Sequence, residues 1–123
     1  IFRGKLEGKG AKVIEVSKKY GICPKFYSAL LCHESTFGTS AFALKYNNVA
    51  GRMEKGGKAP MKFSSVDECL ESSARHLQKN YVLENRVTLA AIQKKYCPIG
   101  AKNDPKGKNR DWLSGLQSLM ERI

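Results

Sequence analysis

Residues 26–32 read Phe-Tyr-Ser-Ala-Leu-Leu-Cys, and this nearly continuous apolar segment constrains the fold more than any other part of the chain. It follows Pro24, which suits the first turn of a helix, and it ends before the small and polar residues 35–40. A helix that is apolar on nearly every side has to be buried on nearly every side. We therefore expect a central helix that the remaining elements surround.

Glu34 stands at the end of this predicted helix. Leu31, Leu30 and Tyr27 precede it at spacings that place all four on one helix face. A carboxyl group between a core and irregular backbone is partly desolvated and lies near the negative end of the helix dipole, and both effects favour its protonated form. Because a general acid must hold a proton, Glu34 is a candidate catalytic residue. The alternative is a solvated or ion-paired glutamate at a helix end.

Most of the remaining pattern is helical. Apolar residues recur at helical spacing in four further segments, residues 13–20, 66–77, 88–92 and 112–123. A capping box of Ser65 and Glu68 marks the start of the second of these. Residues 49–63 instead alternate between apolar and polar around a turn-forming tip, which predicts a small β-hairpin. At 123 residues the chain is expected to be one domain, mainly α with this hairpin.

Three short blocks follow one another along the chain. Residues 34–40 read Glu-Ser-Thr-Phe-Gly-Thr-Ser, residues 47–51 read Asn-Asn-Val-Ala-Gly, and Phe63 precedes the helix that begins near Ser65. In this order they resemble the glucosaminidase family of peptidoglycan hydrolases, which belongs to the lysozyme-like superfamily. Its pattern runs Glu-Ser-x-x-Gly-Thr-Ser, then Asn-Asn-x-x-Gly, then Phe before a helix that begins at a Ser. The resemblance extends from about residue 8 to the end of the chain.

The resemblance implies a lysozyme-like (α+β) fold for a single catalytic domain over residues 1–123. It also implies a glycosidase that cleaves the glycan strand of bacterial peptidoglycan as an endo-β-N-acetylglucosaminidase, with no cofactor and no metal. Two competing functions stay open. One is a lytic transglycosylase or muramidase on the same fold, and the other is a non-catalytic basic module that binds cell wall or nucleic acid.

The resemblance also suggests which residues form the site. Glu34 takes the role of general acid, and Glu54 on the hairpin is the candidate second carboxylate, with a solvated turn residue as its alternative. If no second carboxylate reaches the site, the substrate's 2-acetamido group could act as nucleophile, or its 6-hydroxyl could attack internally as in lytic transglycosylases. Four further residues are candidates for substrate binding, each with a packing or turn role as its alternative: Phe37, Asn48, Phe63 and Tyr96.

The charge of the chain favours an anionic partner. Lys and Arg outnumber Asp and Glu by 22 to 11, which gives a net charge of +11. The basic residues are dispersed and accompany no nucleic-acid module, so anionic cell-wall polymers fit better than nucleic acid. No apolar stretch approaches the ~20 residues of a membrane span. The start at Ile1, without Met or signal peptide, suggests a mature form or an excised domain. We expect a secreted or cell-wall-associated protein that is a monomer.

The cysteines do not indicate a zinc site. Cys23, Cys32, Cys69 and Cys97 form no C-x-x-C pair, and Phe37 stands where an H-E-x-x-H helix would need its second histidine. Two disulfides in any of three pairings and buried free thiols remain equal alternatives.

Overall fold

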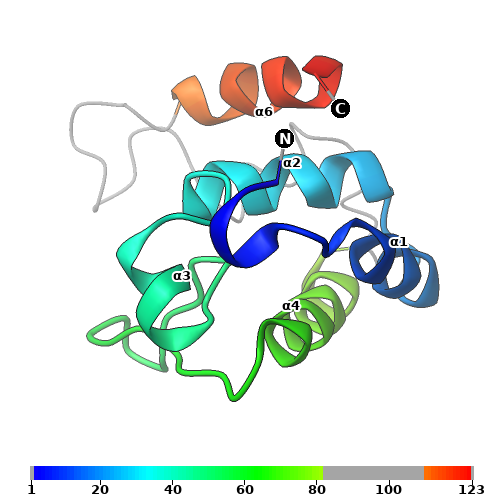
Figure 1. The fold of residues 1–123 in the computed structure, drawn as a ribbon. Helices are drawn as coiled ribbons and strands as arrows, with labels where there is room; N and C mark the ends of the chain where they lie inside the picture. Colours follow the sequence, from blue (N-terminus) through cyan, green and yellow to red (C-terminus); the bar gives the residue numbers. More distant parts are fainter. Residues whose placement is uncertain (1, 82–109, 123) are drawn as a thin grey trace.

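The computed structural model describes residues 2–81 and 110–122 (Figure 1). Its elements are the 3₁₀-helix η1 (Gly4–Leu6) and the α-helices α1 (Gly10–Lys19), α2 (Pro24–Ser35), α3 (Ala41–Tyr46), α4 (Val66–Asn80) and α6 (Arg110–Arg122). The described part of the chain is mainly helical and has no β-strand, so the mainly α part of the predicted fold class is confirmed.

Helix α2 lies at the centre of the molecule. In Figure 1 it passes between α6 on one side and the remaining helices on the other, and it packs directly against α6 and α1. Residues 26–32 are all buried, as their apolar character predicts. Pro24 occupies the first turn, also as predicted, where a missing backbone N–H has no cost.

The surrounding helices each turn one apolar face toward α2 or toward each other. Buried side chains come from α1 (Val13, Val16), α4 (Val66, Cys69, Leu70, Ala74, Leu77) and α6 (Trp112, Leu116, Leu119). The predicted stripe of the last helix is thereby confirmed for its described residues. A Cβ atom at Gly115 of α6 would make ordinary van der Waals contact with the imidazole of His33 at 3.6 Å, so the ring lies directly against this part of α6. Burial against α6 lowers the pKa of His33.

The start of α4 confirms the predicted N-cap. The Ser65 hydroxyl accepts a hydrogen bond from the Glu68 backbone N–H at 3.0 Å. The Glu68 carboxylate reaches one residue further back than a standard capping box, accepting from the backbone N–H of Ser64 at 3.0 Å and from its hydroxyl. Glu68 is therefore a capping residue, as the sequence analysis expects.

Glu71 joins α4 to α1. Its carboxylate accepts hydrogen bonds from Lys19 Nζ at 2.5 Å and from the Tyr20 hydroxyl at 2.8 Å. These two donors lower the pKa of Glu71. These two hydrogen bonds link the C-terminal end of α1 to the side of α4 that faces it.

The predicted β-hairpin forms only as a tight loop. Within the described ranges, residues 49–63 contain one isolated antiparallel bridge, between Met53 and Pro60, and no strand. The chain does reverse direction, since the Glu54 N–H donates to the Ala59 carbonyl at 2.8 Å. A second cross-strand hydrogen bond runs from the Met61 N–H to the Arg52 carbonyl at 2.9 Å, so Pro60 lies in a non-hydrogen-bonded pair where its missing N–H has no cost. The ladder ends there because the Asn48 side chain binds the Arg52 N–H and the Met61 carbonyl, the two groups that would extend it.

Helix α3 is absent from the sequence expectations. The Ser40 hydroxyl caps it by accepting from the Ala43 N–H at 3.2 Å, and Asn47 ends it in a left-handed conformation with φ 54°. Six residues show too little apolar periodicity for a helix to be predicted. The cap residues at its two ends are the only signal.

The described cysteines are free thiols. Cys32 and Cys69 are buried, and Cys23 is exposed. Burial raises the pKa of the Cys32 thiol to about 11. The predicted helix over 88–92, Tyr96 and Cys97 lie outside the described residues. None of the described helices is long and apolar enough to cross a membrane.

Candidate active site

Helix α2 ends abruptly one residue after Glu34. Thr36 and Phe37, with φ of 50° and 61°, are both in the left-handed region, which is uncommon for residues with side chains. Ser35 holds this turn, because its hydroxyl accepts from the Gly38 N–H at 2.9 Å and its carbonyl accepts from the Ser40 N–H at 2.9 Å. Such strain persists where the surrounding structure enforces it, which is common at functional sites. The half-buried Glu34 is thus carried by a rigid helix and bordered by a fixed turn.

The backbone of Gly51 lies directly against the side chain of Glu34. A Cβ atom built on Gly51 would stand 2.9 Å from Oε2 and 3.4 Å from Cβ of Glu34. Gly51 also has φ +66°, a conformation that favours glycine. The backbone angle therefore favours glycine at this position, and any larger residue would have to displace the Glu34 carboxyl group.

Asn48 fixes the segment that carries Gly51. Its side chain is fully buried, and its Nδ2 donates to the carbonyls of Arg52 at 2.7 Å and Met61 at 3.0 Å. Its Oδ1 accepts from the Arg52 N–H at 2.9 Å. The asparagine thus closes a loop over residues 48–52, with Gly51 facing Glu34. This geometry gives the Asn-Asn-x-x-Gly spacing a physical reason.

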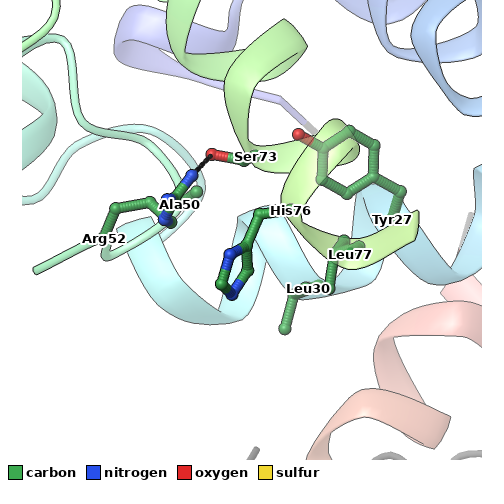
Figure 2. Close-up of a pocket in the computed structure, with 7 residues that line it drawn as sticks. All are labelled: Tyr27, Leu30, Ala50, Arg52, Ser73, His76 and Leu77. Carbon is green, nitrogen blue, oxygen red and sulfur yellow. Dashed lines mark hydrogen bonds between the residues drawn. The ribbon is translucent and has the colours of Figure 1, made fainter. Parts of the chain in front are cut away.

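A small pocket lies beside this loop (Figure 2). It has a volume of about 20 Å³, and its lining comes from α2, the loop and α4: Tyr27, Leu30, Ala50, Arg52, Ser73, His76 and Leu77. The α2 residues share the helix face of Glu34, and the two loop residues flank Gly51 in the chain. The pocket is therefore built from the same helix face and the same loop that hold Glu34, although Glu34 itself does not line it.

The family model described as Glucosaminidase, mannosyl-glycoprotein endo-beta-N-acetylglucosaminidase, matches residues 10–123. The chain belongs to the glucosaminidase family. Membership implies glycosidase activity and confirms the resemblance found in the three sequence blocks. No curated protein matches the chain.

In this glucosaminidase domain the two predicted catalytic residues lie in different surroundings. Glu34 lies between the α2 face and the Gly51 backbone. Glu54 lies on the exposed tip of the loop, where its backbone N–H and carbonyl hold the turn to Ala59 and Gly57. The catalytic roles of both stay predictions.

The predicted substrate-binding residues also have structural contacts. The ring of Phe37 lies between two guanidinium groups, 5.9 Å from that of Arg3 and 5.5 Å from that of Arg122. Phe63 is buried, and its carbonyl accepts from Asn47 Nδ2 at 3.1 Å. Contact with substrate stays a prediction for both, as it does for Asn48, whose amide already makes three hydrogen bonds.

Three residues of the pocket, Arg52, Ser73 and His76, are not among the site residues predicted from the sequence. Arg52 directly follows the Asn-Asn-x-x-Gly block, and this adjacency is the one signal that could have indicated it. The two α4 residues carry no such signal, because only the packing of α4 brings them to the loop. In the part of the chain that the structure describes, no group of three or more potential metal ligands gathers.

Proposed function

We propose that this protein hydrolyses the glycan strand of bacterial peptidoglycan as an endo-β-N-acetylglucosaminidase of lysozyme-like fold, with Glu34 as the general acid. The family membership supports the reaction class. The observation that carries the assignment of the acid is the contact between the Glu34 carboxyl group and the backbone of Gly51, at the end of a buried helix. This arrangement holds one carboxyl group in a fixed, partly desolvated position.

The chemistry requires a proton for the leaving oxygen and stabilisation of an oxocarbenium-like transition state. Glu34 donates the proton to the glycosidic oxygen as the bond to the sugar's anomeric carbon breaks. The fixed turn after α2 and the Gly51 backbone limit the rotamers open to this side chain, and such positioning lowers the entropic cost of proton transfer. As the general acid, Glu34 has to hold its proton until the glycosidic bond breaks.

The second catalytic group is proposed to come from the substrate. Glu68 and Glu71 are engaged in contacts at the start and side of α4, and Glu54 lies on an exposed loop tip. The 2-acetamido group of an N-acetylglucosamine unit can attack its own anomeric carbon as the leaving group departs, and water then opens the resulting ring. This route needs one protein carboxyl group and fits the surroundings of Glu34.

The basic surface extends the proposal to the cell wall. A net charge of +11 favours association with anionic wall polymers, and a substrate in the wall requires a secreted or wall-associated protein. We propose that the domain acts there as a monomer.

The test is digestion of purified peptidoglycan, with the new reducing ends identified by mass spectrometry after borohydride reduction. Reduced N-acetylglucosamine ends are expected. Reduced muramic ends would indicate a muramidase, and anhydro-muramic ends a lytic transglycosylase, and either would overturn the proposed specificity.

The Glu34→Gln variant tests the acid. It should lose at least ~100-fold in activity while folding and binding to walls normally, because general acid catalysis alone is worth about that factor. Glu7→Gln is the matched control, since Glu7 is exposed before α1 and the same substitution there should leave activity unchanged. Near-normal turnover in a folded Glu34→Gln protein would refute the assignment.

A further inference from the structure

The pocket beside the Gly51 loop is close to the proposed acid. Leu30 and Tyr27 precede Glu34 by one and two helical turns, which is about 6 Å and 10 Å along the axis of α2. On the opposite wall, Ala50 and Arg52 flank the glycine that touches the Glu34 carboxyl group. The pocket therefore lies within two helical turns of Glu34 on α2 and directly beside the loop that contacts its carboxyl group.

The size of the pocket limits what enters it. A volume of about 20 Å³ is on the order of one or two water-sized spheres, which is far too small for a sugar ring. A group of a few atoms, such as a carboxylate, fits. The pocket is therefore suited to a substituent of the strand rather than to a sugar unit.

One strong charge borders the pocket. Arg52 Nη1 lies 3.4 Å from the hydroxyls of Ser72 and Ser73, and Figure 2 shows the guanidinium directed toward Ser73 at the pocket. Within residues 2–81 and 110–122, no carboxylate lies within ion-pair distance of Arg52, whereas three lysines, Lys9, Lys12 and Lys19, have such partners. The half-buried guanidinium has two weak neutral contacts and keeps hydrogen-bonding capacity for an anion.

The rest of the pocket is almost entirely apolar. Tyr27, Leu30 and Leu77 supply walls that strengthen a charge pair with Arg52 but offer an anion no hydrogen bond, so the guanidinium alone offsets the cost of taking the anion out of water. Asn48 binds both the N–H and the carbonyl of Arg52, so the backbone that carries the guanidinium is held in place. The planar guanidinium can bind both oxygens of a carboxylate at once.

We propose that Arg52 and this pocket form a subsite for a carboxylate substituent of the glycan strand, next to the bond that is cleaved. The proposal rests on the proposed function, because it takes the strand to be peptidoglycan. Two sources offer this chemistry: the lactyl carboxylate of muramic acid without peptide, and the carboxylates of the stem peptide. The subsite distinguishes muramic-containing strands from neutral polymers of N-acetylglucosamine.

The test measures binding rather than turnover, so that it does not depend on the reaction proposed for Glu34. Glu34→Gln protein and the Glu34→Gln/Arg52→Gln double variant are titrated calorimetrically with three soluble fragments of equal length. These are a neutral N-acetylglucosamine oligomer, a peptide-free muramic strand, and a muramic strand with stem peptides. The substitution at Arg52 keeps the backbone contacts with Asn48, so the loop is retained.

The affinity ratio of muramic to neutral fragments should fall about 10-fold or more in the double variant, as expected for lost hydrogen bonds to a charged group. If the affinity ratio falls for the peptide-free strand, the bound group is the lactyl carboxylate. If the ratio falls only for the strand with stem peptides, the bound group is a carboxylate of the peptide. Lys58→Gln, which removes one positive charge from the exposed loop tip, is the control and should leave the ratio unchanged.

An unchanged ratio in the Arg52 variant would overturn the subsite, as would an equal fall for Lys58→Gln. An equal loss for all three fragments would also overturn it, because Arg52 would then support the loop rather than select the substrate. Failure of the proposed function has a different signature. Wild-type protein would release no reducing ends from peptidoglycan, while the affinity ratio would still report on Arg52.

Discussion

Gly51 and Glu34 are in contact across the candidate site, and a single added carbon at Gly51 would stand 2.9 Å from Oε2 of the glutamate. The contact joins two different structural elements. One is a buried helix that supplies the carboxyl group, and the other is a loop whose shape depends on a buried asparagine. The position of the proposed acid therefore depends on the backbone of the loop as well as on its own helix.

Gly51→Ala, compared with a glycine that has no such contact, should distinguish the effect of the Glu34 contact on activity from the effect of backbone strain on stability. A left-handed alanine costs about 1–2 kcal/mol of stability, and the displaced Glu34 carboxyl group should in addition lower activity by up to about 100-fold. Gly57→Ala is the matched control, because Gly57 has φ +70° and nothing within 4 Å of an added Cβ. Both variants should lose similar stability in urea unfolding, and only the first should lose activity. Equal activities in the two variants would mean that the contact does not position Glu34.

Asn48→Ala should destabilise the protein, because it leaves the carbonyls of Arg52 and Met61 and the N–H of Arg52 without their partner. Buried groups left in this state cost about 1–3 kcal/mol, measurable as a lower urea midpoint. Asn47→Gly is the comparison, since it loses one side-chain hydrogen bond and keeps the φ of 54° at low cost. A smaller loss of stability for Asn48→Ala than for Asn47→Gly would contradict the role of Asn48 in holding the loop.

Glu54→Gln should retain a substantial part of the activity. Its side chain is exposed at the loop tip, and its hydrogen bonds to Ala59 and Gly57 use only backbone atoms, which the substitution keeps. The measurement is the rate of cell-wall clearing alongside Glu34→Gln. A loss as large as that of Glu34→Gln would make Glu54 the second catalytic carboxylate and would replace the substrate-assisted route.

Salt should weaken wall association more than cleavage. The attraction of a protein with net charge +11 to an anionic wall is long-ranged, and screening shortens its reach from ~10 Å at 0.1 M to ~3 Å at 1 M salt. Cleavage of a short soluble fragment depends on contacts near Glu34 that are partly shielded from solvent and should change far less. Wall binding that is insensitive to salt would show that specific sugar contacts dominate. A parallel fall of both would show that charge pairs near Glu34, including any at Arg52, are screened as strongly as the contacts of the outer surface.

The sequence predicted those helices whose burial pattern is regular. The apolar residues 26–32 indicated α2, and the spacing of Trp112, Leu116 and Leu119 indicated α6. The pattern failed where local chemistry decided the structure. Helix α3 depends on its caps at Ser40 and Asn47 more than on periodicity, and the alternation over 49–63 produced one bridge instead of strands.

The candidate site divides in the same way. The position of Glu34 at a helix end followed from the residues around it, because three and four residues are the natural period of a helix. Contact with Gly51 and the placement of Arg52 beside Ser73 did not follow, because they depend on how the loop and α4 pack onto α2. The Asn-Asn-x-x-Gly spacing indicated that a loop was present, and the structure shows which atom of the glutamate it meets.

The burial of α2 affects the temperature at which the candidate site loses its structure. Backbone amides of residues 26–32 are enclosed by α1 and α6, so their hydrogen exchange proceeds only through openings close in free energy to global unfolding. Glu34 is attached to this slowest-exchanging segment, at its last turn. Many catalytic groups sit on segments that open early and lose their geometry before the domain melts. The helical anchor of Glu34 should persist until the cooperative unit itself unfolds, so any loss of activity below the global transition would have to begin in the loop that carries Gly51.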